Sequence, residues 1–413
     1  MIKATKLECG VSLVTEKLPE LKAASIGIWV GAGSAYENPE ISGISHFIEH
    51  MFFKGTKNRT YKEIAESMDN LGAQYNAFTG KEYTCFHAKA ITSAFPKVCD
   101  ILFDMLTNSL FDENEMNKER KVIIEEMRMV EDTPDDIIID YLTANTLAGT
   151  DVANSIIGTR KSLKSIGHNE IVNYIKQQYT KDSIVISVVG SFNEKELVDK
   201  IKECFKKFKA SKAKRQDLAL TGKPKFTNKV RDINQSHLAL GIPTLSMGDD
   251  KYYAQAIVND VLGGSMSSRL FQNIREERGL AYTVYSAPIS YKNIGMLFIY
   301  AAVTLGNEAN AIQGIAEELK NISLTKEEIE NVKQRLKAAY IFGLERLDNR
   351  MMRIGKQQLL LGKAYSDEEA MKEIDSVTIE DVMEYCEKIS DISKYSGAAI
   401  SKNKLDIKKI IHG

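Results

Sequence analysis

The chain has 413 residues, of which 43% are hydrophobic and 27% are charged, and its formal net charge is -1. A single hydrophobic core stops growing at about 250–300 residues, so two or more domains are expected. The near-neutral charge provides no bulk attraction for nucleic acid or for an acidic membrane surface, and we expect neither as a partner.

The cysteines and the N-terminal residues narrow the expected compartment. The five cysteines are scattered and never spaced as C-x-x-C, so neither a disulfide framework nor a thiolate zinc site is expected. Residues 1–17 lack the apolar stretch of a signal peptide, and no apolar run reaches the ~18–20 residues of a membrane span. We therefore expect a cytoplasmic protein, unless a presequence has been removed.

The first half of the chain alternates between strand and helix patterns. Apolar residues that alternate or run between turn signals predict strands, and apolar residues recurring every three to four positions predict helices. In chain order we predict strands at Val11–Thr15 and Ala24–Val30, helices at Gly43–Phe53 and Tyr61–Leu71, strands at Tyr75–Phe78 and Tyr83–Ala88, helices at Phe95–Ser109, Asp112–Glu131 and His168–Gln178, and a strand at Ser183–Val189. This mixture indicates sheets that are covered by helices.

A Lys-rich stretch near the middle of the chain predicts a boundary. Between residues 206 and 230 the apolar pattern fades, and no sustained period replaces it. We predict a solvated linker at residues 211–224, between a first domain at 1–210 and a second at 225–413.

The two predicted domains look like one unit used twice. Two pairs of segments match at an offset of about 211–213 residues: Leu110–Met127 with Ile322–Tyr340, and Ser165–Ile175 with Ser376–Cys386. A period of this length indicates duplicated domains. In this alignment His50 falls opposite Gly263 and Glu126 opposite Ala339, so the second copy lacks the charged groups of the first.

The helix predicted at Gly43–Phe53 carries the pattern H-x-x-E-H, with His46, Glu49 and His50. At 3.6 residues per turn the three side chains share one face. Two imidazoles one turn apart can bind one Zn²⁺ at ~2.0–2.1 Å, and Glu49 is placed to take a proton from a metal-bound water. Zinc also polarises a scissile carbonyl, so the pattern predicts hydrolysis of peptide bonds. Ordinary solvated or core histidines are the alternative.

A catalytic zinc usually takes a third protein ligand. The acidic helix predicted at Asp112–Glu131 offers Glu119, Glu125 and Glu126. Glu119 and Glu126 are seven positions apart, so they share a helix face, and one could bind the metal while the other supports a ligand. A solvated acidic face is the alternative interpretation of these residues.

The motif at His46–His50, followed by Met51–Thr56 and by Glu119–Met127, resembles the inverzincin family of insulinase, pitrilysin and mitochondrial processing peptidase. In that family the third zinc ligand is a Glu about 76 residues beyond the last His of the motif. The resemblance implies that Glu126, 76 positions after His50, is the third ligand and that Glu119 supports the ligands.

The resemblance also implies substrate contacts in both halves. Asn76 and Ala77 match a strand that lines the substrate cleft, although Asn76 could instead end a turn. Arg275 and Tyr282, within Leu262–Ser286, match residues that contact the substrate. The guanidinium could hold a peptide carbonyl or carboxylate, and the phenol could stabilise the oxyanion. A surface charge cluster for Arg275 and strand packing for Tyr282 are the alternatives.

The length is similar to the short two-domain branch that includes bacterial processing-type peptidases. The resemblance implies two homologous α+β domains, each a mostly antiparallel sheet packed with helices, one Zn²⁺ per chain, and a homodimer or possible heterodimer. We expect an endopeptidase for short or unfolded peptides, which would bind as an added strand near Tyr75–Phe78. A non-catalytic partner subunit and a zinc-dependent amidase for small molecules are the alternatives.

Overall fold

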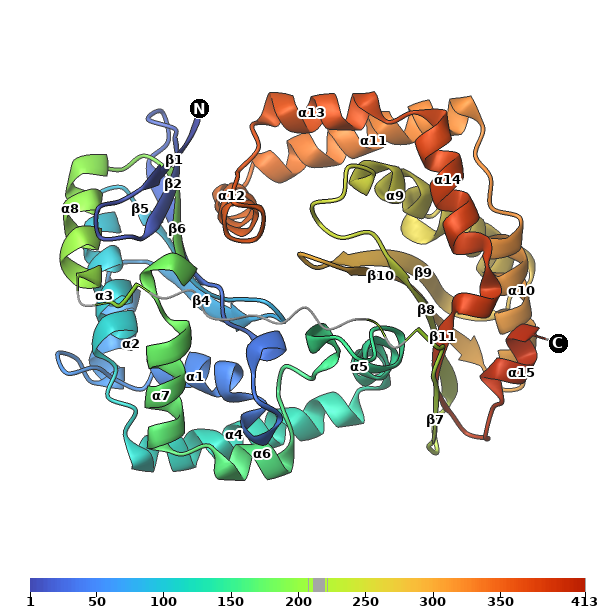
Figure 1. Ribbon diagram of the computed structural model, residues 1–413, viewed down its shortest axis with the longest axis horizontal. Helices are drawn as coiled ribbons and strands as arrows, with labels where there is room; N and C mark the ends of the chain where they lie inside the picture. The colour runs from blue at the N-terminus through green and yellow to red at the C-terminus, as the bar shows by residue number, and fades with distance from the viewer. Residues whose placement is uncertain (207, 211–219, 221, 413) are drawn as a thin grey trace. The chain divides into compact units, whose positions relative to one another are not determined.

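The computed structural model describes residues 1–206, 208–210, 220 and 222–412 (Figure 1). These residues form two compact units. Unit 1 contains the described residues within 1–127, 154–216 and 341–367, and unit 2 contains those within 128–153, 217–340 and 368–413. The predicted linker includes residues 211–219 and 221, which lie outside the described residues, so the domain boundaries stay a prediction.

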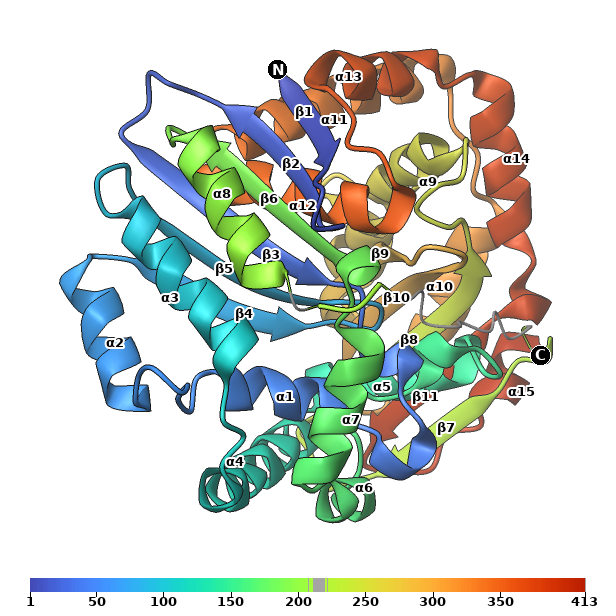
Figure 2. The same ribbon diagram turned by 60° about the vertical axis from the view of Figure 1, so that its left-hand side comes forward.

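Unit 1 is built on a mixed sheet whose neighbouring strands are antiparallel, except that β2 and β6 are parallel. In spatial order the strands are β1 (Ile2–Lys6), β2 (Ser12–Lys17), β6 (Ile184–Gly190), β3 (Ala23–Val30), β5 (Thr84–Ile91) and β4 (Gln74–Thr79). Figure 2 shows α3 and α8 along one face of this sheet.

The helices of unit 1 have the following bounds: α1 (Ile44–Phe52), α2 (Tyr61–Asn70), α3 (Phe95–Asn108), α4 (Glu113–Asp132, of which residues after 127 belong to unit 2), α6 (Arg160–Ser165), α7 (His168–Gln178), α8 (Glu194–Phe205) and α12 (Leu347–Leu361). A large core on the α3 face contains Ile26 and Ile28 of β3 together with Phe47 and Phe52 of α1. A second cluster on the opposite face joins Trp29 of β3 to α12.

Unit 2 is built on a sheet in which β7 and β11 are parallel and the other neighbours are antiparallel. Its strands, in spatial order, are β7 (Phe226–Val230), β11 (Ser396–Ser401), β8 (Gln235–Thr244), β10 (Gly295–Thr304) and β9 (Ala281–Ser290). Its helices are α5 (Pro134–Thr146), α9 (Tyr252–Asn259), α10 (Glu308–Lys320), α11 (Lys326–Leu344, ending past residue 340), α13 (Asp367–Ser376), α14 (Ile379–Ser390) and α15 (Ile407–His412). π-Helical segments lie at Asp260–Gly264 and Phe271–Glu277.

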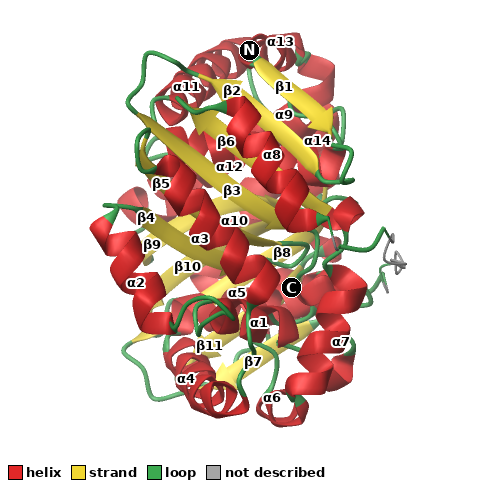
Figure 3. Ribbon diagram, turned by 90° about the vertical axis from the view of Figure 1, so that its left-hand side faces the viewer, coloured by secondary structure: helices red, strands yellow, loops and turns green. Residues whose placement is uncertain are grey.

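The duplication predicted from the sequence is visible in the strand order. Leaving out β1, each sheet arranges its consecutive strands in the spatial order 1-5-2-4-3, with the first and fifth strands parallel. The helices α5 and α12 occupy corresponding places, because α5 packs on β8 and β11 while α12 packs on β3 and β6 (Figure 3 colours helices and strands). Each therefore completes the unit formed mainly by the other half of the chain.

The predicted fold class and elements are confirmed. Both sheets are mostly antiparallel and packed with helices, and the strands and helices predicted in the first half are present with ends shifted by a few residues. All five cysteines are free thiols, of which Cys85, Cys99 and Cys386 are buried. Within the part of the chain that the structure describes, no helix combines the length and the apolar character needed to cross a membrane.

Candidate metal centre

The helix α1 is fixed at its start by a buried carboxylate. The chain enters α1 at Gly43 with a left-handed φ of 91°, a conformation that costs glycine little. Glu37 accepts hydrogen bonds from the backbone N–H of Gly43 at 2.6 Å and of Ser45 at 2.8 Å. These N–H groups have no partner within the helix, and the carboxylate also suits the positive end of the helix dipole. Burial raises the pKa of Glu37, and these backbone hydrogen bonds oppose that rise.

Replacing Glu37 by Gln should therefore loosen the start of α1. The amide retains one acceptor oxygen but turns an NH₂ group toward a backbone N–H, so we expect a loss of about 2 kcal/mol in the free energy of unfolding. Urea unfolding measures this loss. Glu40→Gln is the control, because Glu40 is exposed in the same segment; equal stability of the two variants would show that Glu37 does not hold the helix.

Three side chains of unit 1 converge where the sequence predicts a metal. The ligand atoms of His46, His50 and Glu126 all lie within 4.8 Å of one another. Nε2 of His46 lies 3.7 Å from Glu126 Oε1, and Nε2 of His50 lies 3.5 Å from Glu126 Oε2. Tetrahedral zinc with bonds of ~2.0–2.1 Å separates its ligand atoms by about 3.4 Å. The two nitrogens and the carboxylate therefore fit a zinc ion.

The protonation of these side chains follows from burial and from their contacts. Burial lowers the pKa of His46 to about 4, so this imidazole is neutral at neutral pH, as a metal ligand must be. For His50 burial also acts to lower the pKa, but contacts with Glu126 and Glu119 outweigh it and raise the pKa overall. The contact with His50 lowers the pKa of Glu126. His50 and Glu126 thus stabilise each other's charged forms, whereas burial keeps His46 neutral.

Glu119 holds the ring of His50. Its Oε2 lies 3.1 Å from His50 Nδ1, and its Oε1 lies 2.6 Å from Lys54 Nζ. When Nδ1 carries the proton that faces this carboxylate, Nε2 is the ring nitrogen left to bind a metal. By contrast, Nδ1 of His46 is buried and has no hydrogen-bond partner in the described part of the chain. The structure thus brings Glu119 to the group predicted from the sequence, next to His50 and outside the set of three side chains that converge.

Glu49 lies on the same helix as both histidines but outside the ligand group. Its Oε2 accepts a hydrogen bond of 2.5 Å from Thr79 Oγ1, at the end of β4. Burial raises the pKa of Glu49, and the hydrogen bond from Thr79 opposes this rise. A carboxylate with a raised pKa, held by one oxygen, is suited to accept and return a proton through the other.

The predicted substrate residues lie in two places. Asn76 and Ala77 are on β4, an edge strand, but successive side chains of a strand point to opposite faces. Asn76 is exposed and Ala77 is buried, so the strand presents the side chain of Asn76 to solvent, and the role of both residues in binding substrate stays a prediction. Arg275 and Tyr282 belong to unit 2, where the guanidinium lies 5.7 Å from the exposed ring of Tyr282.

Sequence reasoning missed three residues that support the group: Glu37, Lys54 and Thr79. Their roles depend on contacts across 8, 65 and 30 positions of the chain, with Ser45, Glu119 and Glu49 respectively. Lys54 lies in the segment Met51–Thr56, which contributes to the family resemblance. Nothing in the sequence near Lys54 identifies Glu119 as its partner. Each of the three residues either supplies or contacts a carboxylate that the structure removes at least partly from solvent.

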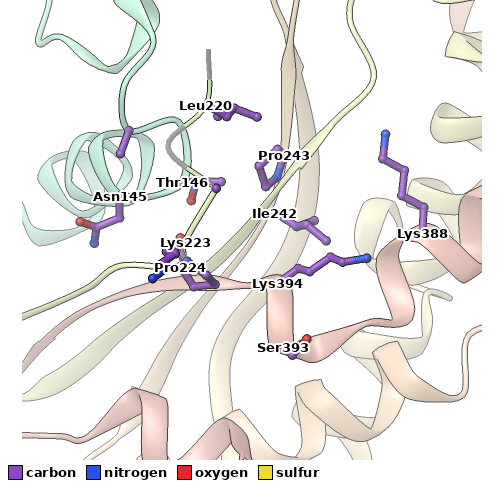
Figure 4. Close-up of a pocket in the computed structure, with 13 residues that line it drawn as sticks. Asn145, Thr146, Leu220, Lys223, Pro224, Ile242, Pro243, Lys388, Ser393 and Lys394 are labelled. Atoms are coloured by element: carbon purple, nitrogen blue, oxygen red, sulfur yellow. The ribbon is translucent and has the colours of Figure 1, made fainter. Parts of the chain in front are cut away.

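A cavity in unit 2 is separate from this group of side chains. It has a volume of about 320 Å³ and lies beside α5, β8 and the start of β11 (Figure 4). Its described lining includes Lys223, Lys388 and Lys394 beside apolar Ile242 and Pro243, and contains no histidine, cysteine or carboxylate. It therefore lacks the ligands that zinc requires.

The described units and the group in unit 1 define a class of protein, a duplicated α+β fold with two histidines and a glutamate arranged to hold a metal. Residues 12–160 match the family described as insulinase (peptidase family M16), and residues 165–336 match the peptidase M16 inactive domain. The chain belongs to this family. The second match is described as an inactive domain. This agrees with the position of His46, His50 and Glu126, which form the candidate metal group of the described residues and lie within the first match.

Relatives extend over nearly the whole chain. The uncharacterized zinc protease YmxG of Bacillus subtilis is 42% identical over 92% of this chain and 94% of its own length. An uncharacterized zinc protease of Rickettsia bellii is 31% identical, with 97% and 98% covered. Among solved structures, a protease from Helicobacter pylori has a TM-score of 0.89 at 19% identity, covering 97% of this chain and 99% of that chain. The fold of the present chain is thus shared with this protease.

Proposed function

We propose that the protein is a zinc-dependent endopeptidase that hydrolyses short or unfolded peptides. The observation that carries this proposal is the convergence of His46 Nε2, His50 Nε2 and the Glu126 carboxylate at distances of 3.5 and 3.7 Å. The names of the relatives, which are zinc proteases, support the same activity. We propose one Zn²⁺ per chain, held by these three residues.

Zinc in this place supplies a Lewis acid that polarises the scissile carbonyl and lowers the pKa of water. Glu49 accepts a proton from the attacking water at Oε1, since its Oε2 is engaged by Thr79. The same oxygen then returns the proton to the leaving amine. Glu119 keeps the ring of His50 in orientation through Nδ1.

The substrate is proposed to bind along β4. This strand pairs with β5 on one side and ends the sheet on the other in the described part of the chain. An extended peptide can add to such an edge through backbone hydrogen bonds, so the sequence preference should be broad. The exposed Asn76 side chain and the backbone of Ala77 are proposed contacts on this strand, and Arg275 and Tyr282 are proposed to hold the peptide and its oxyanion.

We also propose that the protein is cytoplasmic and that it acts as a homodimer. A heterodimer is the alternative assembly. This proposal follows the short two-domain members that the chain resembles. Sedimentation analysis of the purified chain measures the assembly, and a monomer under conditions of full activity would contradict it.

The activity is tested by metal analysis together with hydrolysis of a quenched peptide. We expect about one zinc per chain, loss of hydrolysis with a chelator and recovery on adding zinc. His46→Ala should abolish both zinc binding and hydrolysis, whereas His168→Gln removes an imidazole outside the group and should change neither.

Three other outcomes of this experiment would argue against an endopeptidase. Bound zinc without peptide hydrolysis, but with turnover of a small amide, would favour an amidase. Bound zinc with no turnover of either substrate would favour a non-catalytic partner subunit. Hydrolysis that persists after complete removal of metal would contradict the proposal altogether.

A further inference from the structure

Lys54 lies just beyond the end of α1 and pairs with the carboxylate that supports His50. Its Nζ lies 2.6 Å from Glu119 Oε1, and the side chains of Lys54 and Glu119 are 29% and 8% exposed. Both oxygens of Glu119 are therefore engaged, one by Lys54 and the other by His50 Nδ1. A carboxylate held at both oxygens cannot rotate without losing one of the two contacts.

The loop that follows Lys54 is itself anchored. The buried carboxylate of Asp104, on α3, accepts hydrogen bonds from Thr56 Oγ1 at 2.7 Å, Asn58 Nδ2 at 2.5 Å and Arg59 Nη1 at 2.6 Å. The backbone N–H of Lys54 also donates to Met51 O at 3.1 Å, continuing the last turn of α1. Lys54 thus extends from a segment fixed at both ends, so its ammonium group is well placed to orient a partner.

We propose that Lys54 is a positioning residue that orients Glu119 and, through it, the imidazole of His50 for metal binding. This inference rests on the proposed zinc site. Without the ammonium group, Glu119 would be a buried carboxylate with an unpaired oxygen, which is unfavourable. The carboxylate would turn toward solvent, and the ring of His50 would lose its orienting acceptor.

We expect the loss of Lys54 to weaken zinc binding, because His50 is oriented through a contact with Glu119 and His46 has no such contact at Nδ1. Nδ1 of His46 has no hydrogen-bond partner in the described residues, so no carboxylate fixes its ring through that atom. Residues that hydrogen-bond a metal-binding histidine typically change metal affinity by about 10–100-fold. Lys54 acts one contact further away, and we expect a smaller change of about 3–10-fold.

The test compares Lys54→Met with a matched lysine on α4. Lys118 forms an ion pair of the same 2.6 Å length with Glu115, but its side chain is 68% exposed. The metal-free proteins are titrated with zinc against a chromophoric chelator. We expect Lys54→Met to raise the Kd for zinc about 3–10-fold, Lys118→Met to leave it unchanged, and Lys54→Arg to restore most of the affinity.

A cycle of variants separates positioning through Glu119 from a general effect of charge or of folding. Because Lys54 acts through Glu119, the double variant of Lys54→Met with Glu119→Gln should bind zinc no more weakly than Glu119→Gln alone. Additive losses would overturn the inference, as would an unchanged Kd in Lys54→Met or equal losses in Lys54→Met and Lys118→Met. Thermal unfolding of each metal-free variant confirms that it is folded, and Lys54→Arg provides the folded comparison if Lys54→Met is not. Failure of the wild-type chain to bind zinc would instead contradict the proposed function.

Discussion

Glu49→Gln is expected to lower the rate of peptide hydrolysis by about 10²–10⁴-fold while zinc binding stays close to that of the wild type. The amide keeps the size of the side chain and can still contact Thr79, but it cannot accept a proton from water. Because Glu49 lies outside the group of ligand atoms, its loss should not remove the metal. Hydrolysis of a quenched peptide at saturating substrate and a zinc titration of the same preparation measure the two effects separately.

The matched comparison uses the same chemical change on α4. Glu126→Gln removes a carboxylate that lies 3.5 Å from His50 Nε2, so zinc affinity and hydrolysis should fall together. Glu125→Gln changes its exposed neighbour, which is not part of the ligand group, and should leave both measurements unchanged. Normal hydrolysis by Glu49→Gln would show that another group accepts the proton, and loss of zinc in that variant would assign Glu49 to the metal.

The ligand positions differ in how far the sequence alone could determine them. His46 and His50 are four residues apart, so helix geometry alone places their rings on one face, and the structure brings their centroids to 4.7 Å. Glu126 is far along the chain, and the residues by themselves left Glu119 and Glu125 as alternatives. The resemblance selected Glu126, and in the structure Glu119 contacts His50 and Lys54.

The strands and helices of unit 1 were predictable because their burial follows local periods. In β3, for example, Ile26 and Ile28 face one core and Trp29 faces the other, and the continuous apolar run indicates burial on both faces. The sheet on which α12 packs could not be predicted in this way. An amphipathic helix requires an apolar surface, but its sequence does not specify which of two similar sheets supplies it. In the structure α12 contacts β3 and β6.

One of these contacts is a close approach between α12 and Trp29 that requires glycine. A Cβ atom on Gly355 would lie 2.1 Å from Trp29 Nε1 and 2.6 Å from Ser187 Oγ. The indole also donates a hydrogen bond of 2.8 Å to that hydroxyl, so neither atom can move away without cost. Gly27 on β3 also allows α12 to approach closely, because a Cβ there would lie 2.3 Å from Met351 Sδ.

Gly355→Ala should therefore destabilise unit 1 by about 3 kcal/mol, the upper part of the usual range for overpacking a core. Trp29 is the single tryptophan of the chain and is buried at this contact, so its fluorescence during urea unfolding reports on α12 docking. Gly343→Ala is the matched control, since nothing lies within 4 Å of a Cβ at that helical position; it should be neutral or stabilise by up to about 1 kcal/mol. If both variants unfold at the wild-type urea concentration, the docking of α12 does not depend on this close approach. The other contacts of α12 would then have to hold it on unit 1.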